Sequence, residues 1–166
     1  MAQSWKREAR EVEHRKQDTS APSHTPYPGD AASVEQMLLL ANEYKESAQL
    51  LLPRGRHGVP QSRAPYRLVA IHAIELYLNA LLLHAGTTPS AIRGLQHNLA
   101  LRTDKAIERG LGLRARTAAH LRALTASREY LVSRYDAEMT STSSQINRLT
   151  ATLEEVAKKV RKFVGD

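Results

Sequence analysis

Two charged residues, Glu75 and Arg128, lie within apolar helical stripes and are the positions best placed to do chemistry. In residues 68–83, thirteen of the sixteen side chains are apolar or tyrosine, and the exceptions are His72, Glu75 and Asn79. Their i, i+3, i+7 spacing puts these three on one helix face. A buried carboxylate without a partner costs several kcal/mol, so we expect Arg128 to contact Glu75 or a neighbour on that face. This polar seam is either a structural ion pair or the floor of a site.

The net charge of +7 is concentrated in the middle of the chain. Residues 47–134 contain thirteen Lys or Arg, twelve of them Arg, and only four acidic residues. Arginine suits bidentate contacts with phosphate, so this excess has two interpretations: a basic, soluble surface, or a face that binds phosphate or nucleic acid.

Several classes of site are excluded or disfavoured by composition. The 166 residues include no cysteine, which excludes disulfides, thiolate metal sites and cysteine nucleophiles. The histidines lack metal-ligand spacing and there is no glycine-rich phosphate loop, so we expect neither a metal nor a cofactor. The N-terminus lacks the apolar core of a signal peptide, and the 68–83 run is too short and polar to span a bilayer. We therefore expect a cytoplasmic protein with no membrane partner.

The elements that must position these residues are all helical. Residues 1–30 resemble a disordered tail or an arm ordered by a partner, and residues 31–166 form one helical domain. The first helix is expected from about Ala31 to Leu52, where Pro53 ends it, and the central helix has Pro65 in its first turn and ends at Gly86.

Three more helical segments follow a short turn or helical piece in TTPSAIRGLQ. One begins near His97 or Asn98 and ends at Gly110, and the next runs from about Arg114 to Asp136. The serines of the loop MTSTSS are expected to cap the last helix. No segment alternates as a strand does, so the fold class is all-α, an up-and-down bundle of four to five helices.

The strings AIELYLNALLLHAG and HNLALRTDKAIERGLGL occur in this order within the helical region. Together they resemble the HEPN superfamily (higher eukaryotes and prokaryotes nucleotide-binding domains) over roughly residues 31–164. The first is similar to that family's second helix, an apolar helix with an inner acid that ends in Gly. The resemblance implies an HEPN-like bundle and a homodimer in which Arg128 of both chains lines a shared cleft.

The string REYLVSRY is similar to the family's ribonuclease motif. Arg128 falls on the motif Arg, Glu129 on a polar position and Tyr135 on the motif Tyr, while Ser133 stands where the family places its catalytic His. These residues, with Arg134, are the expected cleft residues. Losing a general acid–base typically lowers the rate 10²–10⁴-fold, and neither serine nor arginine replaces it near pH 7. No catalytic residue is therefore assigned.

Three other Arg–His pairs have the motif's separation of four to six residues: Arg7/His14, Arg67/His72 and Arg114/His120. The first lies in the tail and the second on the wrong helix. The third is the candidate for a displaced active pair.

The sequence therefore predicts an HEPN-like domain that binds a nucleotide, RNA or a protein partner without efficient RNA cleavage. One alternative is a divergent HEPN ribonuclease, the toxin of a toxin–antitoxin pair with a nucleotidyltransferase partner. The other is a structural helical dimerisation module. An open cationic pocket favours nucleotide binding, whereas a packed Arg128–Glu75 pair without a cavity favours the structural module.

Overall fold

The computed structural model describes residues 27–136 and 144–165, and within them the chain consists of helices and loops without a strand. The all-α class is therefore confirmed. Two short 3₁₀ helices, η2 (Leu52–Arg54) and η3 (Pro60–Arg63), join the first two long helices. The α-helices are α2 (Val34–Leu51), α3 (Ala64–His84), α4 (Pro89–Gly94), α5 (Leu99–Glu108), α6 (Ala115–Ala126), α7 (Glu129–Tyr135) and α8 (Ile146–Val164).

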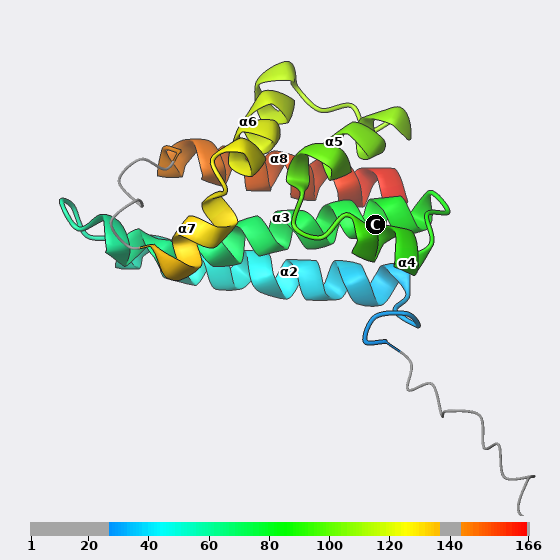
Figure 1. Ribbon diagram of the computed structural model, residues 1–166, viewed down its shortest axis with the longest axis horizontal. Helices are drawn as coiled ribbons and strands as arrows, with labels where there is room; N and C mark the ends of the chain where they lie inside the picture. Colours follow the sequence, from blue (N-terminus) through cyan, green and yellow to red (C-terminus); the bar gives the residue numbers. More distant parts are fainter. Residues whose placement is uncertain (1–26, 137–143, 166) are drawn as a thin grey trace, which may run out of the picture.

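Three long helices form the body of the domain (Figure 1). α2 packs antiparallel to α3, and α8 packs along α3 in the same direction as α3. α5, α6 and α7 are shorter and cover the remaining sides of α3 and α8. The expectation of four to five helices was too low, since seven α-helices lie in the described residues.

The central helix α3 is apolar around most of its circumference because other helices surround it. Ile74, Leu78, Leu81 and Leu82 have no exposed surface. By length and composition alone, the segment Pro60–His84 is long and apolar enough to cross a membrane. The shorter run 68–83 was expected to be too short and too polar for this. In the structure 78% of the tested window is buried inside the protein, as in a core helix.

Local signals set most of the helix ends. α2 begins after Ser33, whose side chain forms a capping box with Gln36, so the helix starts slightly later than the expected Ala31. Asn98 caps α5 through the backbone N–H of Leu101. Gly86 and Gly110 have φ of 83° and 99°, left-handed values that glycine adopts without strain after a helix.

The segment expected to be one helix from Arg114 to Asp136 is two helices, and this prediction was wrong. The break lies at Ser127–Arg128, where Arg128 has φ 52° and ψ 36° and precedes the first residue of α7. In the last turn of α6, both the backbone N–H and the hydroxyl of Ser127 donate to the carbonyl of Ala123. α7 therefore leaves the axis of α6 and packs on α3.

The N-terminal boundary differs from the expected tail of residues 1–30. Residues 1–26, including the Arg7/His14 pair, lie outside the described residues. Tyr27 and Asp30 belong to the folded part, since Arg93 stacks over the Tyr27 ring and pairs with the Asp30 carboxylate.

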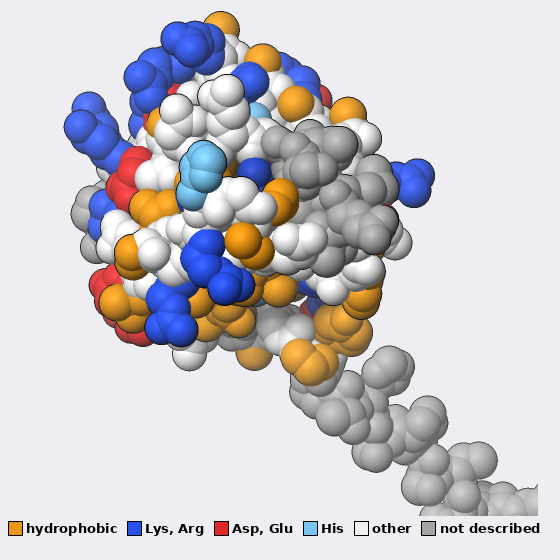
Figure 2. Space-filling model, turned by 90° about the vertical axis from the view of Figure 1, so that its left-hand side faces the viewer, with side chains coloured by type: hydrophobic (Ala, Val, Ile, Leu, Met, Phe, Trp, Pro, Cys, Tyr) orange, Lys and Arg blue, Asp and Glu red, His pale blue; other side chains and the backbone are white. Residues whose placement is uncertain are grey.

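The predicted serine cap of the last helix is also wrong as far as it is described. Residues 139–143 of MTSTSS lie outside the described residues, and the N-cap of α8 is Gln145, which makes no capping bond with its side chain. Figure 2 faces the end of the molecule at which α8 begins, and Lys and Arg side chains are spread over it with few acidic ones between them.

Candidate functional site

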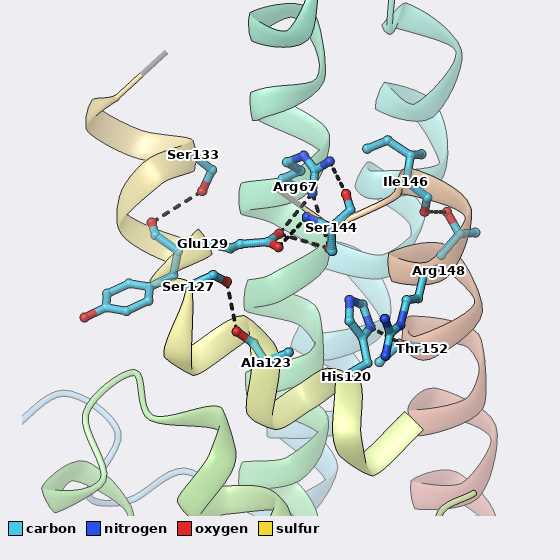
Figure 3. A network of polar contacts seen from close by, with 12 residues as sticks. Arg67, His120, Ala123, Ser127, Glu129, Ser133, Ser144, Ile146, Arg148 and Thr152 are labelled. Carbon is cyan, nitrogen blue, oxygen red and sulfur yellow. Dashed lines mark hydrogen bonds and ion pairs between the residues drawn. The ribbon is translucent and has the colours of Figure 1, made fainter. Parts of the chain in front are cut away.

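A buried ion pair fastens α7 and the start of α8 to the central helix (Figure 3). Arg67 Nη1 lies 2.9 Å from Glu129 Oε2, and the two side chains are 5% and 3% exposed. Glu129 also accepts from the backbone N–H of Ser144 at 2.6 Å, and Arg67 donates to the Ser144 carbonyl. One carboxylate thus holds three segments that are far apart in sequence.

Glu129 was expected to line a cleft with Arg128, and this expectation was wrong. Glu129 points into the protein toward Arg67, whereas Arg128 is exposed at the helix break. The predicted contact between Arg128 and Glu75 is therefore also absent from the described structure. Neither residue type nor spacing in REYLVSRY signals this separation, because the left-handed residue turns the two side chains apart.

The carboxylate of Glu75 does have the partner that its burial requires, but the partner is Arg102 of α5. Arg102 Nη2 lies 3.1 Å from Glu75 Oε1, and His97 Nδ1 lies 3.1 Å from Oε2. Arg102 Nε also donates to Asn79 Oδ1 at 2.7 Å. Glu75 and Asn79 thus form the predicted polar seam around an arginine that is 2% exposed.

His72 lies outside this hydrogen-bond network, although it shares the helix face. Its Nδ1 is buried without a hydrogen-bond partner among the described residues, and its ring packs edge-on against Tyr44 with centroids 4.5 Å apart. Burial lowers the pKa of His72, which favours the neutral ring. The Arg67/His72 pair is therefore part of the core.

The other expected cleft residues lie on α7 and have different surroundings. Ser133 donates to the carbonyl of Tyr130, Arg134 is exposed, and Tyr135 is 79% exposed. The Tyr130 ring stacks against His97 with centroids 5.1 Å apart, which ties α7 to the Glu75 seam.

An open cationic cavity lies elsewhere, between the first turns of α6 and α8, and is called the α6/α8 cleft here. Its volume is about 500 Å³. Among the described residues that line it, three are arginines and none is acidic. They are Arg114, Arg116, Thr117, Gln145, Asn147, Arg148, Ala151 and Thr152.

Two helix N-termini meet at this cleft. Arg114 is the N-cap of α6 and Gln145 is the N-cap of α8, and neither makes a capping hydrogen bond with its side chain. Each helix N-terminus carries about half a positive charge and backbone N–H groups without an intrahelical acceptor. The cleft therefore joins the N-termini of α6 and α8 to three guanidinium groups, of which that of Arg114 is paired with the Glu155 carboxylate.

A buried carboxylate holds the Arg114 wall in place. Glu155 of α8 accepts from the backbone N–H of Arg114 at 2.8 Å, from Arg114 Nε at 2.5 Å and from Thr117 Oγ1 at 2.5 Å. Burial acts to raise the pKa of Glu155, but hydrogen bonds from Arg114, Lys159 and Thr117 outweigh it and lower that pKa to about 2. Glu155 is therefore ionised at neutral pH and fixes α6 against α8.

His120 lies behind the cleft instead of in it. It is 1% exposed, and its Nδ1 is 2.7 Å from Oγ1 of Thr152, which lines the cleft. Figure 3 shows His120, Thr152 and Arg148 grouped below the Arg67–Glu129 pair. Burial lowers the pKa of His120 to about 4, and the charges of Arg148 and Arg67 act in the same direction. The ring is therefore neutral and shielded at pH 7.

The sequence analysis did not predict the α6/α8 cleft, although it singled out two of the residues that line it. Arg114 and Arg116 belong to the basic excess of residues 47–134, and Arg114/His120 was the displaced-pair candidate. Arg148 was not predicted as a site residue, because nothing in the sequence shows that the start of the last helix lies beside residue 114. Among the described residues, no group of three or more His, Asp or Glu is placed to hold a metal ion.

No family model, no curated protein and no solved structure matches this chain. The resemblance to the HEPN superfamily therefore stays a prediction from the strings quoted above.

Proposed function

We propose that this chain is an HEPN-like helical domain that binds the phosphate groups of a nucleotide or an RNA in the α6/α8 cleft, without efficient RNA cleavage. The observation that carries the proposal is the composition of the cleft: three arginines and the N-termini of α6 and α8 surround about 500 Å³, and none of the described lining residues is acidic. Ligand sites commonly have volumes of roughly 300–1,000 Å³.

The cleft has cationic groups available for a ligand. Among the described residues, the guanidinium groups of Arg116 and Arg148 make no ion pair or hydrogen bond, and both residues are exposed. Arginine presents a planar fork that binds phosphate oxygens in pairs, and a helix N-terminus offers N–H donors to the same oxygens. A phosphate in the cleft would satisfy both kinds of donor at once.

Weak or absent cleavage is expected because none of the described residues that line the cleft exchanges protons near pH 7. His120 is the histidine beside the cleft, and its burial and lowered pKa keep it neutral and away from a bound phosphate. Ser133 of the motif is a hydroxyl that does not titrate in this range. Homodimerisation, a nucleotidyltransferase partner and a cytoplasmic location remain predictions of the sequence.

The divergent ribonuclease is kept as a second candidate because Arg114 lines the cleft and His120 contacts Thr152 in its wall. An opening of the cleft that exposes His120 would bring an arginine and an imidazole to the same phosphate. The two candidates differ in whether bound RNA is cut.

The test measures the affinity for a fluorescent single-stranded RNA of mixed sequence, by anisotropy at about 50 mM salt, with a nucleoside diphosphate as competitor. Arg116→Gln combined with Arg148→Gln should lower the affinity at least about tenfold, because each contact with phosphate contributes to counterion release. The matched control, Arg128→Gln with Arg134→Gln, removes the same charge from the motif surface and should change the affinity less than about twofold.

Equal losses in the two double variants would contradict the cleft as the binding site. The same samples, analysed on gels, show whether the RNA is cut. Cleavage by the wild type that disappears in His120→Gln would replace the binding proposal with the ribonuclease candidate.

A further inference from the structure

A second basic hollow continues from the α6/α8 cleft along the outer face of α8, and it is called the α8 groove here. Its volume is about 880 Å³, and it shares Arg114 and Ala151 with the cleft. Its lining residues are Arg114, Ala151, Glu154, Glu155, Lys158, Lys159, Arg161 and Lys162. Because two lining residues are common to both hollows, they form one continuous path over α8.

The two acidic residues of the α8 groove are already neutralised. Glu154 pairs with Lys45 at 3.0 Å, and Glu155 binds Arg114 and Lys159. Lys158, Arg161 and Lys162, in contrast, have no carboxylate partner among the described residues. Three cations beyond the cleft are therefore available to a ligand.

The length of the path exceeds one nucleotide. Arg148 in the cleft and Lys162 at the far end of the α8 groove are fourteen residues apart on one helix, which at about 1.5 Å per residue is roughly 21 Å. A stacked nucleic-acid strand advances about 3.4 Å per phosphate, so this distance accommodates up to about six phosphates. A mononucleotide occupies only the cleft and leaves the α8 groove empty.

We infer that the ligand of this surface is a single-stranded RNA, held with one phosphate in the α6/α8 cleft and with its backbone along the α8 groove to Lys162. This inference rests on the proposed function and narrows it from phosphate ligands in general to a strand of several nucleotides. None of the described residues that line the cleft or the α8 groove is aromatic. Recognition is therefore electrostatic and independent of sequence, in contrast to the base-stacking platforms of many single-strand binders.

An anionic membrane surface is the other ligand that such a row of lysines attracts. The hollowed shape favours a strand, because a narrow chain can follow two adjoining cavities along α8, whereas a bilayer surface is flat. Vesicles therefore form one arm of the test.

The experiment compares fluorescent single-stranded RNAs from two to about twelve nucleotides on the full chain, together with vesicles containing phosphatidylserine. The wild-type affinity should rise with length up to about six nucleotides and then level off. Lys158→Gln with Lys162→Gln should lower the affinity for an RNA of about eight nucleotides much more than that for a dinucleotide. The slope of log K against log salt for the longer RNA should decrease by about 1.4, since each lost phosphate contact on a single strand contributes about 0.7.

The matched control is Lys105→Gln with Arg109→Gln, which removes one charge from the last turn of α5 and one from its C-cap, and it should leave both the length dependence and the slope unchanged. Equal binding of all lengths would overturn the inference and leave the cleft proposal standing. Binding of no RNA at low salt would remove both. Vesicle binding that Lys158→Gln with Lys162→Gln abolishes, while binding of the longer RNA is unaffected, would assign the α8 groove to a membrane surface instead.

Discussion

Replacing Glu129 with alanine removes the one carboxylate that joins α3, α7 and the start of α8. In the wild type, Glu129 pairs with Arg67 at 2.9 Å and accepts from the Ser144 N–H at 2.6 Å. The Glu129→Ala variant leaves the Arg67 guanidinium 5% exposed with only the Ser144 carbonyl and, at 3.5 Å, the Ser144 hydroxyl as partners. The perturbation is therefore a stranded buried cation.

The expected loss follows from that environment. Breaking a buried pair by removing one partner typically costs about 3–5 kcal/mol. Because Arg67 keeps the Ser144 carbonyl as an acceptor, the free energy of unfolding should fall toward the lower end, by about 3 kcal/mol. For a chain of this size each kcal/mol lowers the melting temperature by roughly 2–4 °C, so the midpoint should fall by about 10 °C.

Urea denaturation followed by circular dichroism measures this change, and Arg122→Ala is the matched control. Arg122 pairs with Asp104, but the side chains are 48% and 44% exposed, so the control should lose no more than about 1 kcal/mol. Replacing both buried partners, with Arg67→Met and Glu129→Leu, should recover much of the loss because no charge is left stranded. A Glu129→Ala variant within about 1 kcal/mol of wild type would refute the buried pair and the docking of α7.

Three further predictions concern the seam, the buried histidine and the helix break. Glu75→Ala should lower the free energy of unfolding by about 2–4 kcal/mol, because it removes the carboxylate partner of Arg102 while Asn79 and two carbonyls remain as acceptors. An unchanged urea midpoint would place Glu75 in solvent. The free energy of unfolding should decrease by at most about 3 kcal/mol as the pH falls from 6.5 to about 4. The reason is that the unfolded chain binds a proton on His120 near pH 6.5, whereas the folded protein binds it only near a pKa of about 4. Thermal melts at stepped pH should show that His120→Gln removes most of this pH dependence. Arg128→Gly should leave the melting temperature unchanged or higher, because φ is 52° there, whereas a continuous helix through residue 128 predicts a loss of about 1 kcal/mol.

The helix ends were largely predictable because they depend on residues next to them in the chain. Pro53 directly follows the first residue of η2, just after α2 ends, and Gly86 and Gly110 take the left-handed conformation that follows a helix. Asn98 caps its own helix through a neighbouring N–H. Each of these signals acts over one helical turn, so no knowledge of tertiary packing is needed.

The break between α6 and α7 is not marked by a residue type that commonly ends a helix. The residues around it, Thr125 to Arg128, include neither proline nor glycine, and Arg128 is a good helix former. The burial of Glu129 against Arg67 explains why α7 leaves the axis of α6, and that contact spans 62 positions in the sequence. Tertiary packing here overrides the local preference.

The need of Glu75 for a cationic partner was predictable, but the identity of the partner was not. Arg67, Arg102 and Arg128 all lie within or beside apolar helical stripes, so the sequence pattern does not distinguish them. Packing of α5 on α3 selects Arg102. The α6/α8 cleft was hidden for the same reason, because its two walls come from residues 114–117 and 145–152.

The central claim is that a phosphate ligand binds between the first turns of α6 and α8. The most direct test is to record the backbone amide resonances of the ¹⁵N-labelled protein while single-stranded RNA is added at low salt. The largest shifts should fall on residues 115–117 and 146–148, which form the first turns of α6 and α8 beside the cleft. Shifts centred on Arg128, Arg134 and Tyr135, or no shifts at any RNA concentration, would contradict the claim.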